Sequence, residues 1–159
     1  MSEYTTSLFT ADCLLFTPMP DRQEFIDFIL DHYENPRHHG PLADADVVMK
    51  GGNPGCGDVV TMYLRLDEAE RVVDVSFEGE GCTISQAATS IVTDKVLGKT
   101  LTEVTALNHE VIVDEMGPEV VANRLRCATL ALNTLKAAEK KYHAGQAAKT
   151  VSEAKLENF

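Results

Sequence analysis

The chain has 159 residues, of which 44% are hydrophobic and 25% are charged, a composition typical of one soluble globular domain. The formal net charge is −11, and lysine and arginine form no cluster, which argues against a nucleic-acid partner. No apolar run approaches the roughly 18 residues that would cross a membrane. The stretch "SLFTADCLLFTPMP" lacks the basic start of a signal peptide, so we expect a cytoplasmic protein with reduced thiols.

The N-terminal part of the chain divides into an extension and a helix. Residues 1–19 show no sustained period and are interpreted as an N-terminal extension. A helix is predicted from Asp21, and it ends in "ENPRHHGP", because Pro36 disfavours a helical residue before it. The apolar residues expected on one face of this helix are Phe25, Ile26, Ile29, Leu30 and Tyr33.

Three short strands are predicted next, at residues 46–50, 59–66 and 71–79. Residues 67–70 join the second and third strands as a short hairpin loop, which favours an antiparallel meander. A glycine-rich segment, "GGNPGCGD", connects the first strand to the second.

The second half of the chain has the pattern of three helices. The first runs from Cys82 toward Gly98, and the second begins with the capping box formed by Thr100 and Glu103 and ends at Gly117. Pro118 can open the third, which runs to about residue 142. The predicted fold class is therefore α+β, a small three-stranded antiparallel sheet with helices packed on one face. We place the domain at residues 20–143 and a flexible C-terminal tail at 144–159.

Three of the four cysteines stand where chain segments change direction. Cys56 and Asp58 lie in the strand-connecting loop, Cys82 starts a helix, and Cys127 falls early in the last helix. If these segments meet at one end of the sheet, three thiolates and one carboxylate converge. Such a set suits zinc, and thiolates also suit an iron–sulfur cluster. The glycines on both sides of Cys56 allow the sharp turn that this convergence needs.

Four motifs carry a resemblance to a known family. "FILDHYENPRHHG", "GNPGCGD", "FEGEGCTISQAATS" and "RLRCATLALNTL" occur in this order, and together they resemble the IscU/NifU-type iron–sulfur assembly proteins over roughly residues 22–142. The resemblance implies the IscU/SufU-like fold. It also implies that the protein scaffolds a nascent cluster or accepts sulfur from a cysteine desulfurase.

The third cysteine motif indicates the branch of the family. Arg126 stands where the IscU branch has a histidine, and the ending resembles the SufU branch, whose site holds zinc. The "LPPVK" segment of the IscU branch is absent, whereas the short spacing across 83–126 is nearer to IscU. Carried over from the resemblance, the ligands are Cys56, Asp58, Cys82 and Cys127, and Arg124 is a supporting residue.

The resemblance also implies the chemistry. A SufS- or IscS-like desulfurase would carry a persulfide, and this chain would take the terminal sulfur, with Cys56 as the expected acceptor and Cys127 as the competitor. Zn²⁺ is the expected resting metal, with iron or a [2Fe–2S] cluster as the alternative. Other SUF assembly proteins or apo-acceptor proteins are further expected partners. The protein would be an assembly factor and not a conventional enzyme.

Other interpretations of the same residues stay open. A binding module with a purely structural zinc is the main alternative, and a thiol enzyme ranks last because the chain has no Cys-x-x-Cys. Cys13 lies outside the resemblance and is interpreted as a surface or packed thiol. Solvated or structural roles are favoured over metal binding for His32, His38 and His39, and His109 is expected to be a surface residue.

Overall fold

The computed structural model describes residues 18–145 and 152–155. In chain order the elements are α1 (Arg22–Glu34), β1 (Val47–Asn53), β2 (Asp58–Leu66), β3 (Val72–Glu80), α2 (Thr83–Val96), α3 (Leu101–Ala106), α4 (His109–Met116), α5 (Pro118–Val121), the short 3-10 helix η2 (Ala122–Arg124), α6 (Leu125–His143) and β4 (Ser152–Lys155). Residues 1–17 of the predicted extension, and Cys13 with them, lie outside the described residues.

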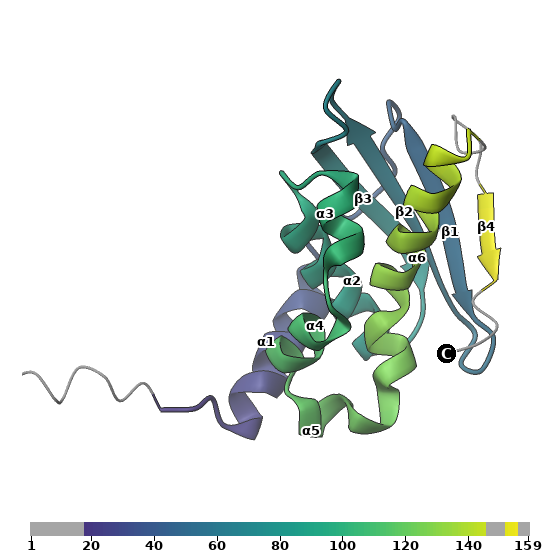
Figure 1. The fold of residues 1–159 in the computed structure, drawn as a ribbon. Coiled ribbons are helices and arrows are strands. Elements are labelled where there is room, and N and C mark those ends of the chain that lie inside the picture. The colour runs from purple at the N-terminus through teal and green to yellow at the C-terminus, as the bar shows by residue number, and fades with distance from the viewer. Residues whose placement is uncertain (1–17, 146–151, 156–159) are drawn as a thin grey trace, which may run out of the picture.

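The sheet contains the predicted meander and one further strand. Its strand order is β3-β2-β1-β4, and β2 pairs antiparallel with both β1 and β3. β4 pairs in parallel with β1, where Met49 lies opposite Ser152 (Figure 1). The three-stranded antiparallel sheet is confirmed. The sequence predicts only a flexible tail at residues 144–159, whereas residues 152–155 of that tail form a strand.

Loops contact the free edge of β3. In the middle of the strand, the N–H of Phe77 donates to the carbonyl of His38 (3.0 Å), and the N–H of Gly40 donates to the carbonyl of Phe77 (2.9 Å). At the start of the strand, Val72 exchanges two backbone hydrogen bonds of 2.8 Å with residues 98–99. The β3 edge of the sheet therefore has loop neighbours along part of its length, and β4 forms the opposite edge.

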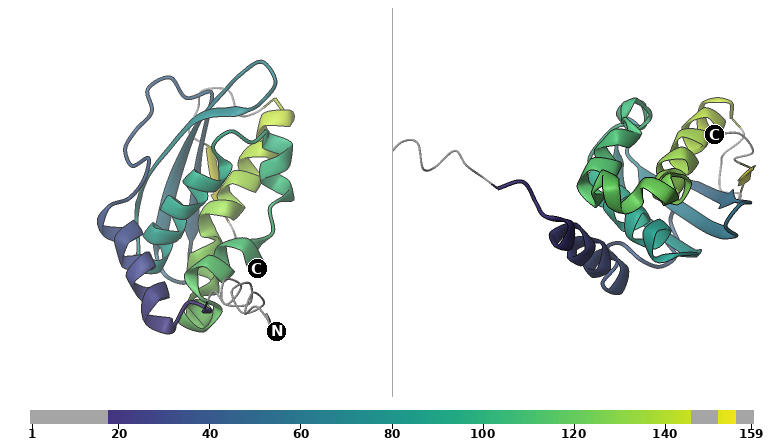
Figure 2. Two further views of the ribbon diagram at one scale, coloured as in Figure 1. Left: turned by 90° about the vertical axis from the view of Figure 1, so that its left-hand side faces the viewer. Right: turned by 90° about the horizontal axis from the view of Figure 1, so that it is seen from below.

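The helices cover one face of the sheet, as the sequence predicts. α6 packs on β1 and β2, α2 packs on β3, and α1 packs on α2 away from the sheet (Figures 1 and 2). Each large side chain buried between the layers contributes roughly 1.5–3 kcal/mol of transfer free energy. The largest are Phe77, Met49, Met62, Leu64, Ile91, Leu101, Ile112, Met116, Leu132 and Leu135.

β1 is longer than predicted and passes through the glycine-rich segment. The predicted strand ends at residue 50, whereas the observed strand continues through Gly51 and Gly52 to Asn53. A Cβ on Gly51 would lie 1.9 Å from Oγ1 of Thr134 in α6. Gly51 therefore permits the close approach of α6 to β1, and its role is one of packing and not of loop flexibility.

The predicted apolar face of α1 is partly wrong. Ile29 is buried, but Leu30 and Tyr33 are 41% and 44% exposed, while His32 is only 4% exposed. The Nδ1 atom of His32 lies 2.8 Å from Oγ of Ser90 in α2. This contact gives His32 a structural role at the interface between α1 and α2.

We expect His32 to make stability depend on pH. Burial of the ring, and then the charge of Arg37, lower the pKa of His32 below its ordinary 6.5, and the opposing effects of Asp94, Asp31 and Glu115 are smaller. As the pH falls, the unfolded chain therefore takes up the proton before the folded protein does, so stability is fully present above pH 6.5 and declines below it.

The measurement is the melting temperature of the wild type and of His32→Gln between about pH 8 and pH 5, the range in which histidine titrates. The melting temperature of His32→Gln should be lower than that of the wild type at about pH 8. It should then decline less steeply than that of the wild type as the pH falls to about 5. Equal slopes for the two proteins would contradict the assignment to His32.

Two of the predicted helices are interrupted. The predicted helix from Thr100 to Gly117 is divided into α3 and α4, because the side chain of Asn108 caps α4 by accepting from the N–H of Glu110. The capping box of Thr100 and Glu103 is confirmed. The predicted last helix opens at Pro118 as α5, passes through η2, and restarts as α6 at Leu125.

Candidate metal centre

The turn between β1 and β2 carries the first thiol. The N–H groups of Cys56 and Gly57 donate to the backbone carbonyl of Asn53, at 3.2 and 2.9 Å. Gly57 has φ of 70°, which a residue with a side chain rarely adopts. Cys56 is exposed at this turn. Asp58 is the first residue of β2 and is buried.

The second thiol caps a helix. Cys82 is the N-cap of α2, and its Sγ accepts from the N–H of Ser85 (3.4 Å). Its own N–H donates to Oδ1 of Asp58 (2.9 Å), and its Sγ lies 3.7 Å from Oδ2 of the same carboxylate. A Cβ on Gly81 would lie 2.7 Å from Oδ1 of Asp58. The glycine before Cys82 therefore leaves the space in which the carboxylate sits.

The third thiol comes from the start of α6. Cys127 lies in the first turn of this helix and is 1% exposed. Its Sγ lies 3.6 Å from Sγ of Cys56. Burial, and then contact with Asp58, Cys56 and Cys82, raises the pKa of the Cys127 thiol well above its ordinary range. Without a cation this sulfur holds its proton, and a metal ion would have to displace it.

The ligand atoms form one group at the end of the sheet where the β1–β2 turn lies. One ligand atom from each of Cys56, Asp58 and Cys127 lies within 4.8 Å of the others, and Cys82 joins the group through its two contacts with Asp58. Three sulfurs and a carboxylate oxygen provide four ligands for a tetrahedral ion, and the thiols also suit an iron–sulfur cluster. The donor set therefore fits the metals expected from the sequence.

Two arginines stand beside Cys127. Arg124 and Arg126 are both exposed, and neither side chain forms a hydrogen bond or an ion pair with another residue in the described part of the chain. Arg124 is the N-cap residue of α6 but makes no side-chain cap. Its supporting role stays a prediction.

The remaining histidines have other neighbours. Nε2 of His38 lies 3.2 Å from Oδ1 of Asp94, and the ring of His39 packs edge-on against Phe77. The sequence predicts a surface residue at His109, but the side chain is half-buried, with Nε2 2.6 Å from Oδ1 of Asn133. Within residues 18–145, no histidine belongs to a metal-ligand group.

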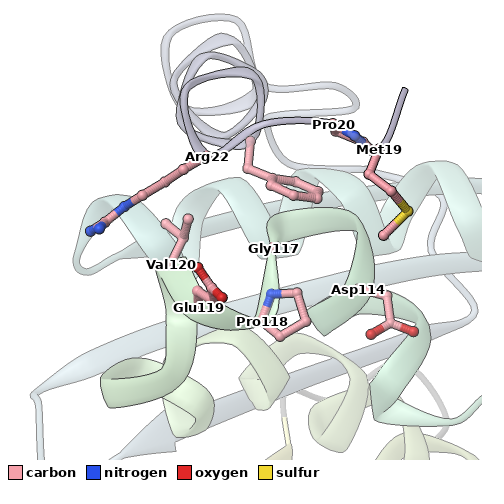
Figure 3. Close-up of a pocket in the computed structure, with 9 residues that line it drawn as sticks. Met19, Pro20, Arg22, Asp114, Gly117, Pro118, Glu119 and Val120 are labelled. Atoms are coloured by element: carbon pink, nitrogen blue, oxygen red, sulfur yellow. The ribbon is translucent and has the colours of Figure 1, made fainter. Parts of the chain in front are cut away.

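A separate cavity of about 400 Å³ lies between the start of α1 and the connection of α4 to α5 (Figure 3). Its lining contains none of the four candidate ligands and consists of Met19, Pro20, Arg22, Phe25, Asp114, Gly117, Pro118, Glu119 and Val120.

Among the described residues, no helix is both long and apolar enough to span a bilayer.

Sequence reasoning missed two groups that touch the sulfurs. The amide of Asn53 approaches Cys127, with Nδ2 4.0 Å from Sγ, and the N–H of Ser85 contacts Cys82. Asn53 lies inside the "GNPGCGD" motif, but its approach to Cys127 depends on how α6 packs against β1. No local pattern carries that information.

Fold and site together define a two-layer α+β domain with a group of cysteines and an aspartate, suited to a metal ion, at one end of its sheet. A sequence model of the NifU-like N terminal domain family matches residues 24–149. The chain belongs to this family.

Named relatives agree with the family. The chain is 36% identical over 134 residues to the iron-sulfur cluster assembly scaffold protein IscU of Streptococcus pyogenes serotype M1, covering 74% of this chain and 83% of the relative. It is 36% identical over 121 residues to the protein of the same name from Haemophilus influenzae, covering 74% of this chain and 94% of the relative.

Solved structures share the fold. One is a candidate iron–sulfur cluster assembly scaffold protein for the SUF system from Fervidobacterium islandicum AW-1, with 31% identity and a TM-score of 0.61 over 71% of this chain and 94% of that one. A NifU-like N-terminal domain from Brucella abortus, at 22% identity, has a TM-score of 0.64 over 76% of this chain and 98% of that one.

Proposed function

We propose that this protein is an iron–sulfur cluster assembly factor that binds metal or a nascent cluster and accepts sulfur from a cysteine desulfurase. The ligands are Cys56, Asp58, Cys82 and Cys127. The observation that carries the proposal is the 3.6 Å separation of the Cys56 and Cys127 sulfurs beside the Asp58 carboxylate. The names of the relatives, which are scaffold proteins for iron–sulfur cluster assembly, support it.

Sulfur acceptance requires an accessible thiolate. Cys56 is the exposed member of the cluster, whereas Cys127 is buried and Cys82 is half-buried. The Cys56 thiolate attacks the terminal sulfur of the desulfurase persulfide. The S–S bond of the desulfurase breaks, a new S–S bond forms on Cys56, and the desulfurase cysteine leaves as a thiolate. The terminal sulfur changes partner, and the step needs no external oxidant.

Zinc is the resting metal that we propose, as in the SufU branch. When bound, zinc holds thiols deprotonated and shields them from oxidation. Asp58 is the anionic oxygen ligand, and Arg124 supports the site from the start of α6. Iron or a [2Fe–2S] cluster is then the cargo that the same residues receive. A SufS- or IscS-like desulfurase is the proposed donor, and SUF or apo-acceptor proteins are the proposed recipients.

A purely structural zinc is the second candidate. A structural site usually encloses its ligands, whereas Cys56 is exposed on a four-residue turn. The exposure of this ligand favours sulfur chemistry. Chelation followed by a thermal melt separates the two candidates, because a structural zinc predicts loss of the folded state without metal.

The test is an analysis of metal and acid-labile sulfide in protein purified without air. We expect one zinc per chain, no sulfide, and loss of zinc in Cys56→Ser, because the variant lacks one of the four ligands. Iron and sulfide in equal amounts would instead make the protein a cluster scaffold. If the wild-type protein contained no metal and no sulfide, and still bound none after reconstitution with zinc or iron, the proposed function would be contradicted.

A further inference from the structure

Asn53 is a buried polar residue in contact with the candidate ligand set. It is the last residue of β1 and is 6% exposed. Its side-chain Oδ1 accepts from the N–H of Gly55 (3.2 Å), and its Nδ2 approaches Sγ of Cys127 to 4.0 Å. Among the described residues, Cys127 is the one hydrogen-bond partner of this amide nitrogen.

The backbone of Asn53 is close to two further candidate ligands, Cys56 and Asp58. Its carbonyl oxygen accepts from the N–H groups of Cys56 and Gly57. In the sheet, Asn53 pairs with Asp58. One residue therefore contacts the turn that carries Cys56, lies opposite Asp58, and faces the sulfur of Cys127.

The two ends of the side chain act differently. Oδ1 holds the turn, a local role that any short acceptor can fill. Nδ2 is a neutral donor directed at sulfur from a second element, and an N–H directed at sulfur strengthens when the sulfur is an anion. A donor of this kind orients a ligand and changes its electron density without occupying a coordination position.

We propose that Asn53 is a positioning residue of the metal centre, which orients the sulfur of Cys127 through its side-chain N–H. The inference rests on the proposed function of the cysteine cluster. Cys127 is buried and receives the Asn53 donor, whereas Cys56 is exposed on a turn.

The test uses Co²⁺ as the probe, because thiolate-to-cobalt charge-transfer absorption reports on the sulfur ligands. Asn53→Asp keeps an oxygen for the N–H of Gly55 but places an oxygen where the donor faces Cys127. We expect a shifted charge-transfer band and Co²⁺ affinity weaker by about 10–100-fold, the range seen for outer-shell partners of metal ligands.

Two further variants complete the experiment. Asn53→Ser can hold the turn through its hydroxyl but is too short to reach Cys127, and it should repeat the loss of affinity if Asn53→Asp does not fold. Asn133→Asp makes the same chemical change at a buried asparagine that contacts His109, and it should leave the cobalt spectrum unchanged.

The outcomes separate the inference from the proposed function. An unshifted band and wild-type affinity in Asn53→Asp and Asn53→Ser would overturn the role of Asn53 and leave the metal centre standing. A wild-type protein without thiolate-to-cobalt absorption would overturn the proposed function and the inference together.

Discussion

Replacement of Cys56 by serine is expected to abolish sulfur transfer from a persulfide-bearing cysteine desulfurase to this chain while the fold is retained. The side chain is exposed on the β1–β2 turn, so the change removes a nucleophile without opening a cavity in the core. A serine hydroxyl stays protonated near neutral pH and cannot attack the persulfide as a thiolate does. Mass spectrometry after reaction with the desulfurase and free cysteine should show the added mass of one sulfur on the wild type only.

Two control variants make the result specific. Cys13→Ser removes a thiol outside the candidate cluster and should accept sulfur at the wild-type rate. Cys127→Ser removes the competing acceptor, which is buried, and a peptide that carries the extra sulfur should still map to Cys56. Normal transfer to Cys56→Ser would assign the acceptor role to another cysteine.

Gly51→Ala is expected to produce the largest loss of stability among single-methyl additions in β1. The new Cβ would lie 1.9 Å from Oγ1 of Thr134, a side chain that is fully buried. The Thr134 hydroxyl donates to the carbonyl of Leu130 at 2.8 Å, so it cannot turn away without losing a buried hydrogen bond. Overpacking of this kind costs about 3 kcal/mol, and the melting temperature should fall by roughly 6–12 °C.

The neighbouring glycine provides the matched control. A Cβ on Gly52 would meet the carbonyl of Asp58 at 3.8 Å, an ordinary contact, so Gly52→Ala should change the melting temperature much less. In the double variant Gly51→Ala, Thr134→Ala, the destabilisation should be smaller than the sum of the single changes, because the clashing hydroxyl is absent. Equal melting temperatures for the two alanine variants would show that α6 does not pack against Gly51.

The sequence predicts those parts of the fold that depend on local patterns. Alternation of apolar residues predicts the three antiparallel strands, and the capping box of Thr100 and Glu103 predicts the start of α3. The expected meeting of the β1–β2 turn with two helix starts at one end of the sheet agrees with the observed positions of Cys56, Cys82 and Cys127. A meander returns each strand beside the previous one, which brings the β1–β2 turn near the start of α2. The start of α6 joins them through the packing of that helix on β1.

The parts that the sequence does not predict depend on distant contacts. His32 is buried on α1 because Ser90 of α2 faces it, and no helical period distinguishes it from the exposed Leu30 and Tyr33. The interruptions before α4 and α6 fall within segments that look continuous. In the sequence, Gly51 and Gly52 suggest a loop. The structure shows instead that the approach of α6 leaves no space for a side chain at Gly51.

The loop cover on the β3 edge of the sheet bears on how copies of this protein behave at high concentration. An uncovered strand offers a row of unpaired backbone groups on which a strand of another molecule can form. Here the loops at residues 38–40 and 98–99 occupy part of the β3 edge through backbone hydrogen bonds. β3 therefore offers less free backbone on which a strand of another copy could pair, and encounters at this edge are directed to side chains.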